Sequence, residues 1–244
     1  MLSVSRLTGI AQSSLLPLYA RAFETQRSDG IIHDEKSLEQ YYQLENAICT
    51  QIIDEVVLSF LSRHPSGVIA NLGAGLDTRF HRLDNGKTTW YEIDLPEVIE
   101  LRQQFLKEHD RYHFVSASVV EPDWMSKFDK SQPTLFIIQG LANMLEEHEV
   151  RALFKALASR FSQAEVIMEA IGFLYFRLRV VTGYKWGMSA DSWPDKWDPR
   201  IKLLDSQCIF DRYPMRWKEC QWFAPIMAFG KNVHVILHLG IKCG

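Results

Sequence analysis

The pattern of hydrophobic positions divides the chain into a helical first part and an alternating middle. In residues 35–64 hydrophobic side chains recur at every third or fourth position, which is the period of an amphipathic helix. Pro65-Ser66-Gly67 then ends that helix, because proline and glycine disfavour its continuation. Five short β-prone runs follow: "VIANL", "TTWYEI", "YHFVSA", "TLFIIQG" and "AEVIMEA".

Helical segments separate these β-prone runs. "DLPEVIELRQQFLKEH" follows the second run, with Pro96 well placed at a helix start, and "LEEHEVRALFKALASRF" follows the fourth. Alternation of strands and helices across residues 68–170 predicts a mostly parallel sheet with helices on both faces. The pieces "IIQ" and "VIM" do not alternate between apolar and polar, as expected for strands that are buried on both sides.

The rhythm changes after the fifth run. Residues 171–205 are rich in aromatic residues, glycine and proline, and we expect them to form an insertion or cap. The tail contains "RWKECQWF" and "NVHVILHLGI", with Pro225 and Gly230 between them. These two runs predict a closing antiparallel pair of strands.

Composition and charge fit an ordinary globular protein. The 244 residues are 47% hydrophobic and 23% charged, with a formal net charge of −3, so no basic surface for nucleic acid or an anionic membrane is indicated. No apolar run approaches the roughly 20 residues of a membrane span, and the N-terminus is a poor signal peptide, so we expect a cytoplasmic protein. The scattered cysteines Cys49, Cys208, Cys220 and Cys243 indicate neither a zinc site nor a disulfide framework.

A glycine pair follows the first predicted strand, in "VIANLGAGLDTRF". Gly73, Ala74 and Gly75 lie where a parallel sheet binds its ligands, and glycine lets the backbone approach a ligand closely. The next strand ends in "YEID", with Glu92 and Asp94. A carboxylate at that point can accept hydrogen bonds from both ribose hydroxyls of a nucleoside.

Two nucleoside cofactors are compatible with a glycine loop followed by an acid. NAD prefers a third glycine, but Thr78 stands there, and Asp77 places a negative charge where a pyrophosphate would rest. S-adenosylmethionine carries no phosphate, so an acidic loop is acceptable, and this cofactor is favoured. An NAD-dependent oxidoreductase and a simple tight turn without a ligand remain as alternatives.

The motifs also resemble a known family. "NLGAGLDTRF" and "WYEIDLPEVIELR" resemble the leucine carboxyl methyltransferase superfamily. "ARAFETQRSDGIIHD", "QGLANMLEEHEVRALFKALASRF" and "FDRYPMRW" resemble its bacterial branch related to the tetracenomycin polyketide O-methyltransferase. The resemblance implies an α/β class I, Rossmann-like methyltransferase fold, with a seven-stranded, mostly parallel sheet whose last strand is antiparallel. It divides the chain into a helical lid, residues 1–64, and a methyltransferase domain, residues 65–244, that carries the cap at 171–205.

The resemblance also implies which residues bind the cofactor. The glycine loop would line the methionine part, Asp94 would hold the ribose, and a basic lid residue would pair with the carboxylate. The full set carried over is Arg21, Asn71, Gly73, Ala74, Gly75, Asp94, Leu95, Ser118, Val119, Gln139 and Gly140. Ser118 and Gln139 stand where the family often has acids, and this motivates a further alternative, a degenerate adenosylmethionine-binding module without catalysis.

The expected chemistry is methyl transfer to a hydroxyl or carboxyl oxygen of a small molecule, for example a polyketide or another secondary metabolite. A hydroxyl acceptor needs a base, whereas a carboxylate is already ionised at neutral pH. His33 on the lid and His148 are the candidate bases, although His148 also fits the solvated start of a helix. His234 and His238 share one face of the last strand, where packing beneath a helix is favoured over metal binding.

Aromatic residues of the cap have two interpretations. Tyr175, Tyr184, Trp186 and Trp193 would either wall a pocket for a flat or apolar acceptor, or simply cover the sheet. The residues themselves do not decide between these interpretations, and the acceptor is not identified by the sequence.

Overall fold

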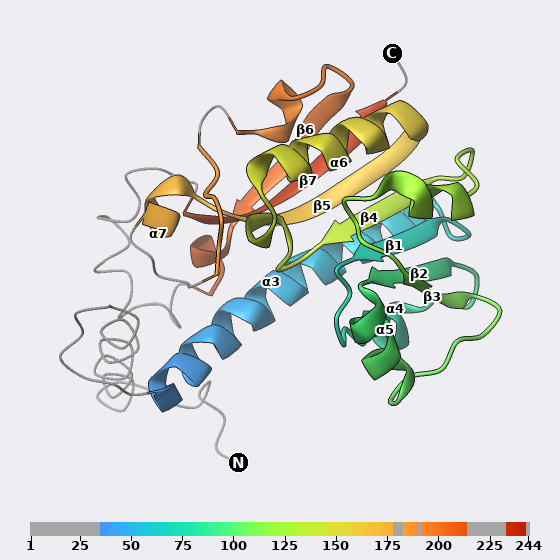
Figure 1. The fold of residues 1–244 in the computed structure, drawn as a ribbon, viewed down its shortest axis with the longest axis horizontal. Coiled ribbons are helices and arrows are strands. Elements are labelled where there is room, and N and C mark those ends of the chain that lie inside the picture. Colours follow the sequence, from blue (N-terminus) through green and yellow to red (C-terminus); the bar gives the residue numbers. More distant parts are fainter. Residues whose placement is uncertain (1–34, 178–182, 190–191, 214–232, 243–244) are drawn as a thin grey trace.

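A computed structural model describes residues 35–177, 183–189, 192–213 and 233–242 (Figure 1). Its centre is a seven-stranded sheet in the order β3-β2-β1-β4-β5-β7-β6. The strands are β1 (Val68–Leu72), β2 (Thr89–Asp94), β3 (Tyr112–Ser116), β4 (Thr134–Ile138), β5 (Gln163–Ile171), β6 (Ile201–Cys208) and β7 (His234–Lys242). Strands β1 to β5 pair in parallel, and β7 is antiparallel to both β5 and β6. The predicted fold class is therefore confirmed.

The five β-prone runs of the middle region became β1 to β5. Every residue of β1 and of β4 is buried, which explains why neither strand alternates between apolar and polar positions. β2 and β4 lie on opposite sides of β1, so the chain reverses its direction of travel across the sheet between β3 and β4. This reversal places a topological switch point at the carboxyl ends of β1 and β4.

The expected partner of the last strand was wrong. The run "RWKECQWF" lies outside the described residues, and the outer edge of β7 is paired with β6 instead. β6 is an edge strand with five consecutive exposed residues, so it lacks the hydrophobic alternation that marks a strand in sequence. Since β6 begins at Ile201, the last residues assigned to the cap belong to the sheet.

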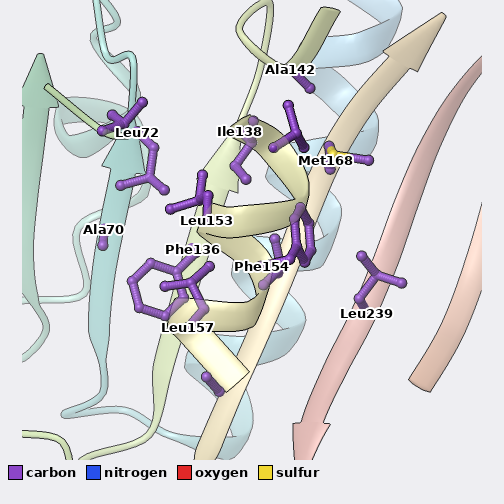
Figure 2. Packing of buried hydrophobic residues seen from close by; sticks show 14 of the residues in the cluster. Ala70, Leu72, Phe136, Ile138, Ala142, Leu153, Phe154, Leu157, Met168 and Leu239 are labelled. Atoms are coloured by element: carbon purple, nitrogen blue, oxygen red, sulfur yellow. The ribbon is translucent and has the colours of Figure 1, made fainter. Parts of the chain in front are cut away.

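Helices cover both faces of the sheet (Figure 1). α3 (Glu35–Arg63) and α4 (Arg79–Leu83) pack on one face, and α6 (Glu147–Arg160) packs on the other. Figure 2 shows Leu153, Phe154 and Leu157 of α6 among the buried side chains of β1, β4, β5 and β7. The shorter helical elements are α5 (Pro96–Gln103), α7 (Phe173–Arg177), η2 (Pro122–Lys127), η3 (Ala142–Met144), η4 (Pro194–Lys196) and η5 (Ile209–Asp211).

The second half of α3 is a core helix. Ile48, Ile52, Val57 and Phe60 are almost completely buried against the sheet. The predicted lid, residues 1–64, therefore includes a helix segment that belongs to the core. The first part of that predicted lid, residues 1–34, lies outside the described residues. Among the helices that the structure describes, none combines the length and the apolar character needed to span a membrane.

Candidate cofactor-binding site

The glycine loop after β1 has the conformation of a tight strand-to-helix turn. Gly73 and Gly75 have φ angles of +69° and +51°, in the left-handed region that favours glycine. The N–H groups of Gly73 and Ala74 both donate to the carbonyl oxygen of Ile93 on β2, at 2.9 and 3.2 Å. A Cβ atom at Gly73 would lie 3.0 Å from the Leu141 side chain, whereas one at Gly75 would meet none of the residues that the structure describes within 4 Å. The loop is thus fixed on one side and open on the other.

Asp94 joins the glycine loop to the end of β2. Its Oδ2 atom accepts the N–H of Gly75 at 2.7 Å, and its Oδ1 atom accepts the N–H of Leu95 at 2.7 Å. A carboxylate has about four lone-pair sites, so Asp94 retains acceptor capacity for ribose hydroxyls. The predicted pairing of loop and acid is therefore a direct contact.

The ends of β3 and β4 lie beside the loop and the acid. The N–H of Ala117 donates to the carbonyl oxygen of Asp94 at 2.9 Å, which keeps the segment with half-buried Ser118 and buried Val119 next to β2. At the end of β4, Gly140 has a φ of +68°, and a Cβ atom there would meet nothing within 4 Å among the described residues. Open space, a carboxylate with free acceptor capacity and the 44% exposed Leu95 fit the nucleoside and amino-acid parts of S-adenosylmethionine.

A buried ion pair holds the main chain of the loop. The sequence did not predict it. Arg102 and Glu92 are fully buried, with Nη2 and Oε1 2.9 Å apart. Arg102 also donates to the carbonyl oxygens of Gly75 and Asp77, at 2.7 and 2.5 Å, and to the Tyr112 hydroxyl at 2.6 Å. Burial raises the pKa of Glu92 to about 7, although Arg102 opposes the shift. Arg102 thus holds the main chain of the loop.

Arg79 is a second buried cation that the sequence did not single out. Its guanidinium donates to Asp54 of α3 at 2.6 Å, to Asp77, and to Oε1 of Gln139 at 2.8 Å. Gln139 also contacts Thr50 of α3 through Nε2, at 3.4 Å. The Gln139 side chain is therefore engaged with Arg79 and α3, and one buried group links the helix, the loop and the end of β4.

The environment of Asp77 corrects one step of the sequence argument. Its carboxylate is paired with Arg79 and accepts a hydrogen bond from Asn71 Nδ2 at 3.0 Å, so the loop does not present an uncompensated negative charge. Thr78 still occupies the position of the third glycine, and α4 has only five residues, a poor platform for a pyrophosphate. Asn71 itself is buried and also donates to Glu92 at 2.9 Å, so its contacts lie within the protein.

The aromatic and histidine candidates divide by location. Trp186 is 5% exposed, donates its indole N–H to the carbonyl oxygen of Ala142 at 2.8 Å and lies in the main core, so it covers the sheet and does not wall a pocket. Tyr184 packs against Ile171 and Val233. His148 is exposed on the first turn of α6, the solvated position that its sequence also suggested.

Three other candidates are not placed. Arg21 and His33 lie outside the described residues, and so does the side chain of Tyr175, whose backbone is in α7.

A buried cluster of ionisable groups adjoins Gly140. Glu169 of β5 accepts the Gly140 N–H at 3.1 Å through Oε2, and its Oε1 atom lies 2.7 Å from His234 Nε2 and 3.7 Å from Cys49 Sγ. Burial raises the pKa of Cys49 to about 11. Burial disfavours charge on Glu169 and His234 too. The contact with His234 nevertheless lowers the pKa of Glu169, and contacts with Cys49 and then Glu169 raise the pKa of His234.

Both histidines of the last strand face α3, as the packing interpretation predicts. His234 contacts Cys49 of α3 at 3.5 Å, while His238 lies 2.7 Å from Glu165, which is bonded to Arg63 at the end of α3. The role of Glu169 was missed because its partners come from three elements far apart in sequence.

The fold and the site define a class of protein. A seven-stranded sheet of this order, with a glycine loop after β1 bonded to an acid after β2, is the arrangement of an S-adenosylmethionine-dependent methyltransferase. Solved structures with the same fold include a protein from Thermobifida fusca described as a methyltransferase, with a TM-score of 0.62, 13% identity and coverage of 92% of this chain and 94% of that one. The plantazolicin methyltransferase BamL, bound to S-adenosylhomocysteine, has a TM-score of 0.54 at 10% identity and covers 95% of this chain and 98% of its own.

Sequence comparison identifies the family. Residues 37–158 match the model of the leucine carboxyl methyltransferase family, which is half of the chain, and the protein belongs to that family. The tetracenomycin polyketide synthesis O-methyltransferase TcmP of Streptomyces glaucescens is 28% identical over 182 residues, 68% of this chain and 67% of that protein. An S-adenosyl-L-methionine-dependent methyltransferase of Gibberella zeae is 23% identical over 191 residues, 66% of this chain and 64% of its own length. The chain thus spans about two thirds of the length of these relatives.

Proposed function

We propose that the protein is an S-adenosylmethionine-dependent O-methyltransferase that acts on a hydroxyl or carboxyl group of a small molecule, of the polyketide or a related secondary-metabolite type. The observation that carries the proposal is the bond between Asp94 and the N–H of Gly75, which joins a ribose acceptor to an open glycine loop. Similarity to TcmP, an O-methyltransferase of polyketide synthesis, supports the acceptor class.

The bound cofactor would supply an activated methyl group, so the protein's task is mainly to position the two reactants. In this proposal Gly73, Ala74 and Gly75 line the methionine part, and Asp94 accepts the ribose hydroxyls. Val119 and Leu95 supply apolar surface for the adenine, with Ser118 at its edge. Arg102 and Arg79 act indirectly, because they hold the loop and the end of β4 in place.

The acceptor decides whether a base is needed. A carboxylate acceptor is ionised at neutral pH and needs none, whereas a phenol or alcohol must lose its proton. His33 and His148 stay predictions for that role, as does Arg21 for binding the cofactor's carboxylate. Tyr175 and Tyr184 remain the proposed pocket residues, and Trp186 is withdrawn from that set because it is buried in the core.

Calorimetry with S-adenosylhomocysteine tests the proposal. We expect Asp94→Asn to weaken binding about 10- to 150-fold, since a hydrogen bond to a charged group is worth about 1.5–3 kcal/mol. Asp205→Asn is the matched control, because Asp205 is exposed on the edge strand β6 and should leave binding unchanged. Absence of any binding at millimolar concentration would refute the proposal, and binding of NADH in its place would favour an oxidoreductase. Binding without turnover of any hydroxylated or carboxylated acceptor would indicate a degenerate module.

A further inference from the structure

The buried Glu169 carboxylate divides its two oxygens between the site and the core. Oε2 accepts the main-chain N–H of Gly140 at 3.1 Å, whereas Oε1 faces His234 at 2.7 Å and the Cys49 thiol at 3.7 Å. Glu169 is 9% exposed, His234 3% and Cys49 0%, so water has little access to these contacts. A charge-assisted bond to a main-chain N–H in such surroundings fixes the orientation of that peptide group.

This bond also determines where the neighbouring carbonyl points. The described chain has no cis peptide bonds, so the N–H of Gly140 and the C=O of Gln139 point in opposite directions across one planar peptide group. Glu169 is on β5, so the Gln139 carbonyl points away from Glu169, and β1 with its glycine loop lies on the other side of β4 from β5.

The glycine loop leaves room for the Gln139 carbonyl to accept a hydrogen bond from a ligand. The N–H of Gly73 donates to Ile93 of β2 as the regular continuation of the β1–β2 pairing, and the N–H of Ala74 turns to the same Ile93 carbonyl. A Cβ atom at Gly140 would meet none of the described residues within 4 Å, so the described part of the chain leaves the space beside this peptide open. The side chain of Gln139 is held by Arg79, and the main chain is therefore the polar group that this position offers to a ligand.

We propose that the Glu169–His234 pair is a positioning device of the cofactor site, which fixes the Gly140 peptide so that the Gln139 carbonyl accepts a hydrogen bond from the ammonium group of the bound cofactor. The inference rests on the proposed function, because it assigns one polar end of that same cofactor to a group of the chain. Glu169 and His234 act through the peptide and do not touch the cofactor themselves.

A metal centre is the competing interpretation of the same residues. The ligand atoms of Cys49, Glu169 and His234 lie within 4.8 Å of one another. However, His234 Nε2 and Glu169 Oε1 are 2.7 Å apart, a hydrogen-bond distance. A zinc ion with bonds of about 2.0–2.2 Å in tetrahedral geometry would hold two such atoms more than about 3 Å apart. The distance favours a hydrogen-bonded pair.

The test compares two ligands that differ in the amino-acid part. S-adenosylhomocysteine carries the ammonium group, whereas 5′-methylthioadenosine keeps the adenosine and lacks it. We expect Glu169→Gln to weaken S-adenosylhomocysteine binding about tenfold and to leave methylthioadenosine binding unchanged within twofold, as measured by calorimetry. His234→Gln, which removes the partner of Glu169, should likewise weaken S-adenosylhomocysteine binding and leave methylthioadenosine binding unchanged. Melting temperatures identify any variant that fails to fold.

The chain contains a matched control for this experiment. Glu165→Gln alters a Glu–His pair on the same two strands, away from Gly140, and should change neither affinity. Equal weakening of both ligands, or of neither, in a folded Glu169→Gln protein would overturn the proposal. One zinc per chain in the purified protein, lost in Glu169→Gln, would overturn it in favour of a metal centre. If the unaltered protein binds neither ligand, the proposed function fails instead.

Discussion

Two Glu–His pairs join β5 to β7 on the face covered by α3, and they differ in their surroundings. Glu169–His234 and Glu165–His238 have the same Oε–Nε2 distance of 2.7 Å. The first pair is more deeply buried, with the His234 and Glu169 side chains 4% and 11% exposed, and the second carboxylate oxygen of Glu169 holds a peptide of the candidate site. The second is partly open, with side chains 14% and 16% exposed, and is bonded to Arg63, which is 46% exposed. The same kind of Glu–His hydrogen bond thus occurs once beside the candidate site and once away from it.

The two pairs differ in which partners remain for the carboxylate when its histidine is removed. Burial raises the pKa of Glu165, but hydrogen bonds from His238 and Arg63 outweigh it and lower that pKa to about 2. If His238 is removed from the Glu165–His238 pair (the outer pair), Glu165 keeps Arg63 and water as partners. In the Glu169–His234 pair (the inner pair), removal of His234 leaves the Glu169 carboxylate with two neutral partners, the Gly140 N–H and the Cys49 thiol, in a buried position where desolvation is costly.

The largest expected effect is therefore on the inner pair. His234→Ala should lower the free energy of unfolding by about 3–5 kcal/mol, because it leaves a buried charge without its partner. His238→Ala should lower it by about 1 kcal/mol, since Glu165 keeps its two bonds to Arg63. Urea denaturation at neutral pH measures both. Equal losses would contradict the view that burial distinguishes the two pairs.

Acid should reveal the contribution of the outer pair. The folded pKa of Glu165 is about 2, below its ordinary value of 4.5, so its contribution is fully present above pH 4.5 and is lost as the pH falls towards 2. The shift corresponds to about 3 kcal/mol at most. We expect Glu165→Gln to be about 2–3 kcal/mol less stable than the unaltered protein at pH 6, and the difference to shrink towards pH 2.

Denaturation curves at a series of pH values check this expectation. Other carboxylates titrate equally in both proteins, so the difference isolates Glu165. A difference that stays constant from pH 6 to pH 2 would show that the ionisation of Glu165 is not what stabilises the fold.

The two pairs also mark the limit of what sequence could predict. β1 to β5 and the Asp94–loop contact were predictable, because hydrophobic runs and residues adjacent to strand ends are local signals. Cys49 and Glu169 are 120 positions apart, and Glu169 and His234 are 65 apart, so only the folded topology brings them together.

Two other misses have local physical reasons. The edge strand β6 was missed because solvent on both sides removes the need for alternation. Gln139 was placed correctly at the end of β4, but no local signal predicted that buried Arg79 would engage its side chain.

The smallest expected effect is on Arg63, the solvent-exposed end of the outer pair. Its guanidinium makes two bonds to Glu165, at 2.6 and 2.9 Å, but it is nearly half exposed, and screened ion pairs of this kind contribute about 0.2–1 kcal/mol. Arg63→Gln should therefore cost less than 1 kcal/mol in urea denaturation, and the cost should fall further in 0.5 M salt. Arg212→Gln, which breaks a similar exposed pair with Glu55 at 2.7 Å, is the control for a general charge effect. If Arg63→Gln lowered the free energy of unfolding as much as His234→Ala, the outer pair would depend on its cation as strongly as the inner pair depends on its histidine. Exposure would then no longer explain how the two pairs differ.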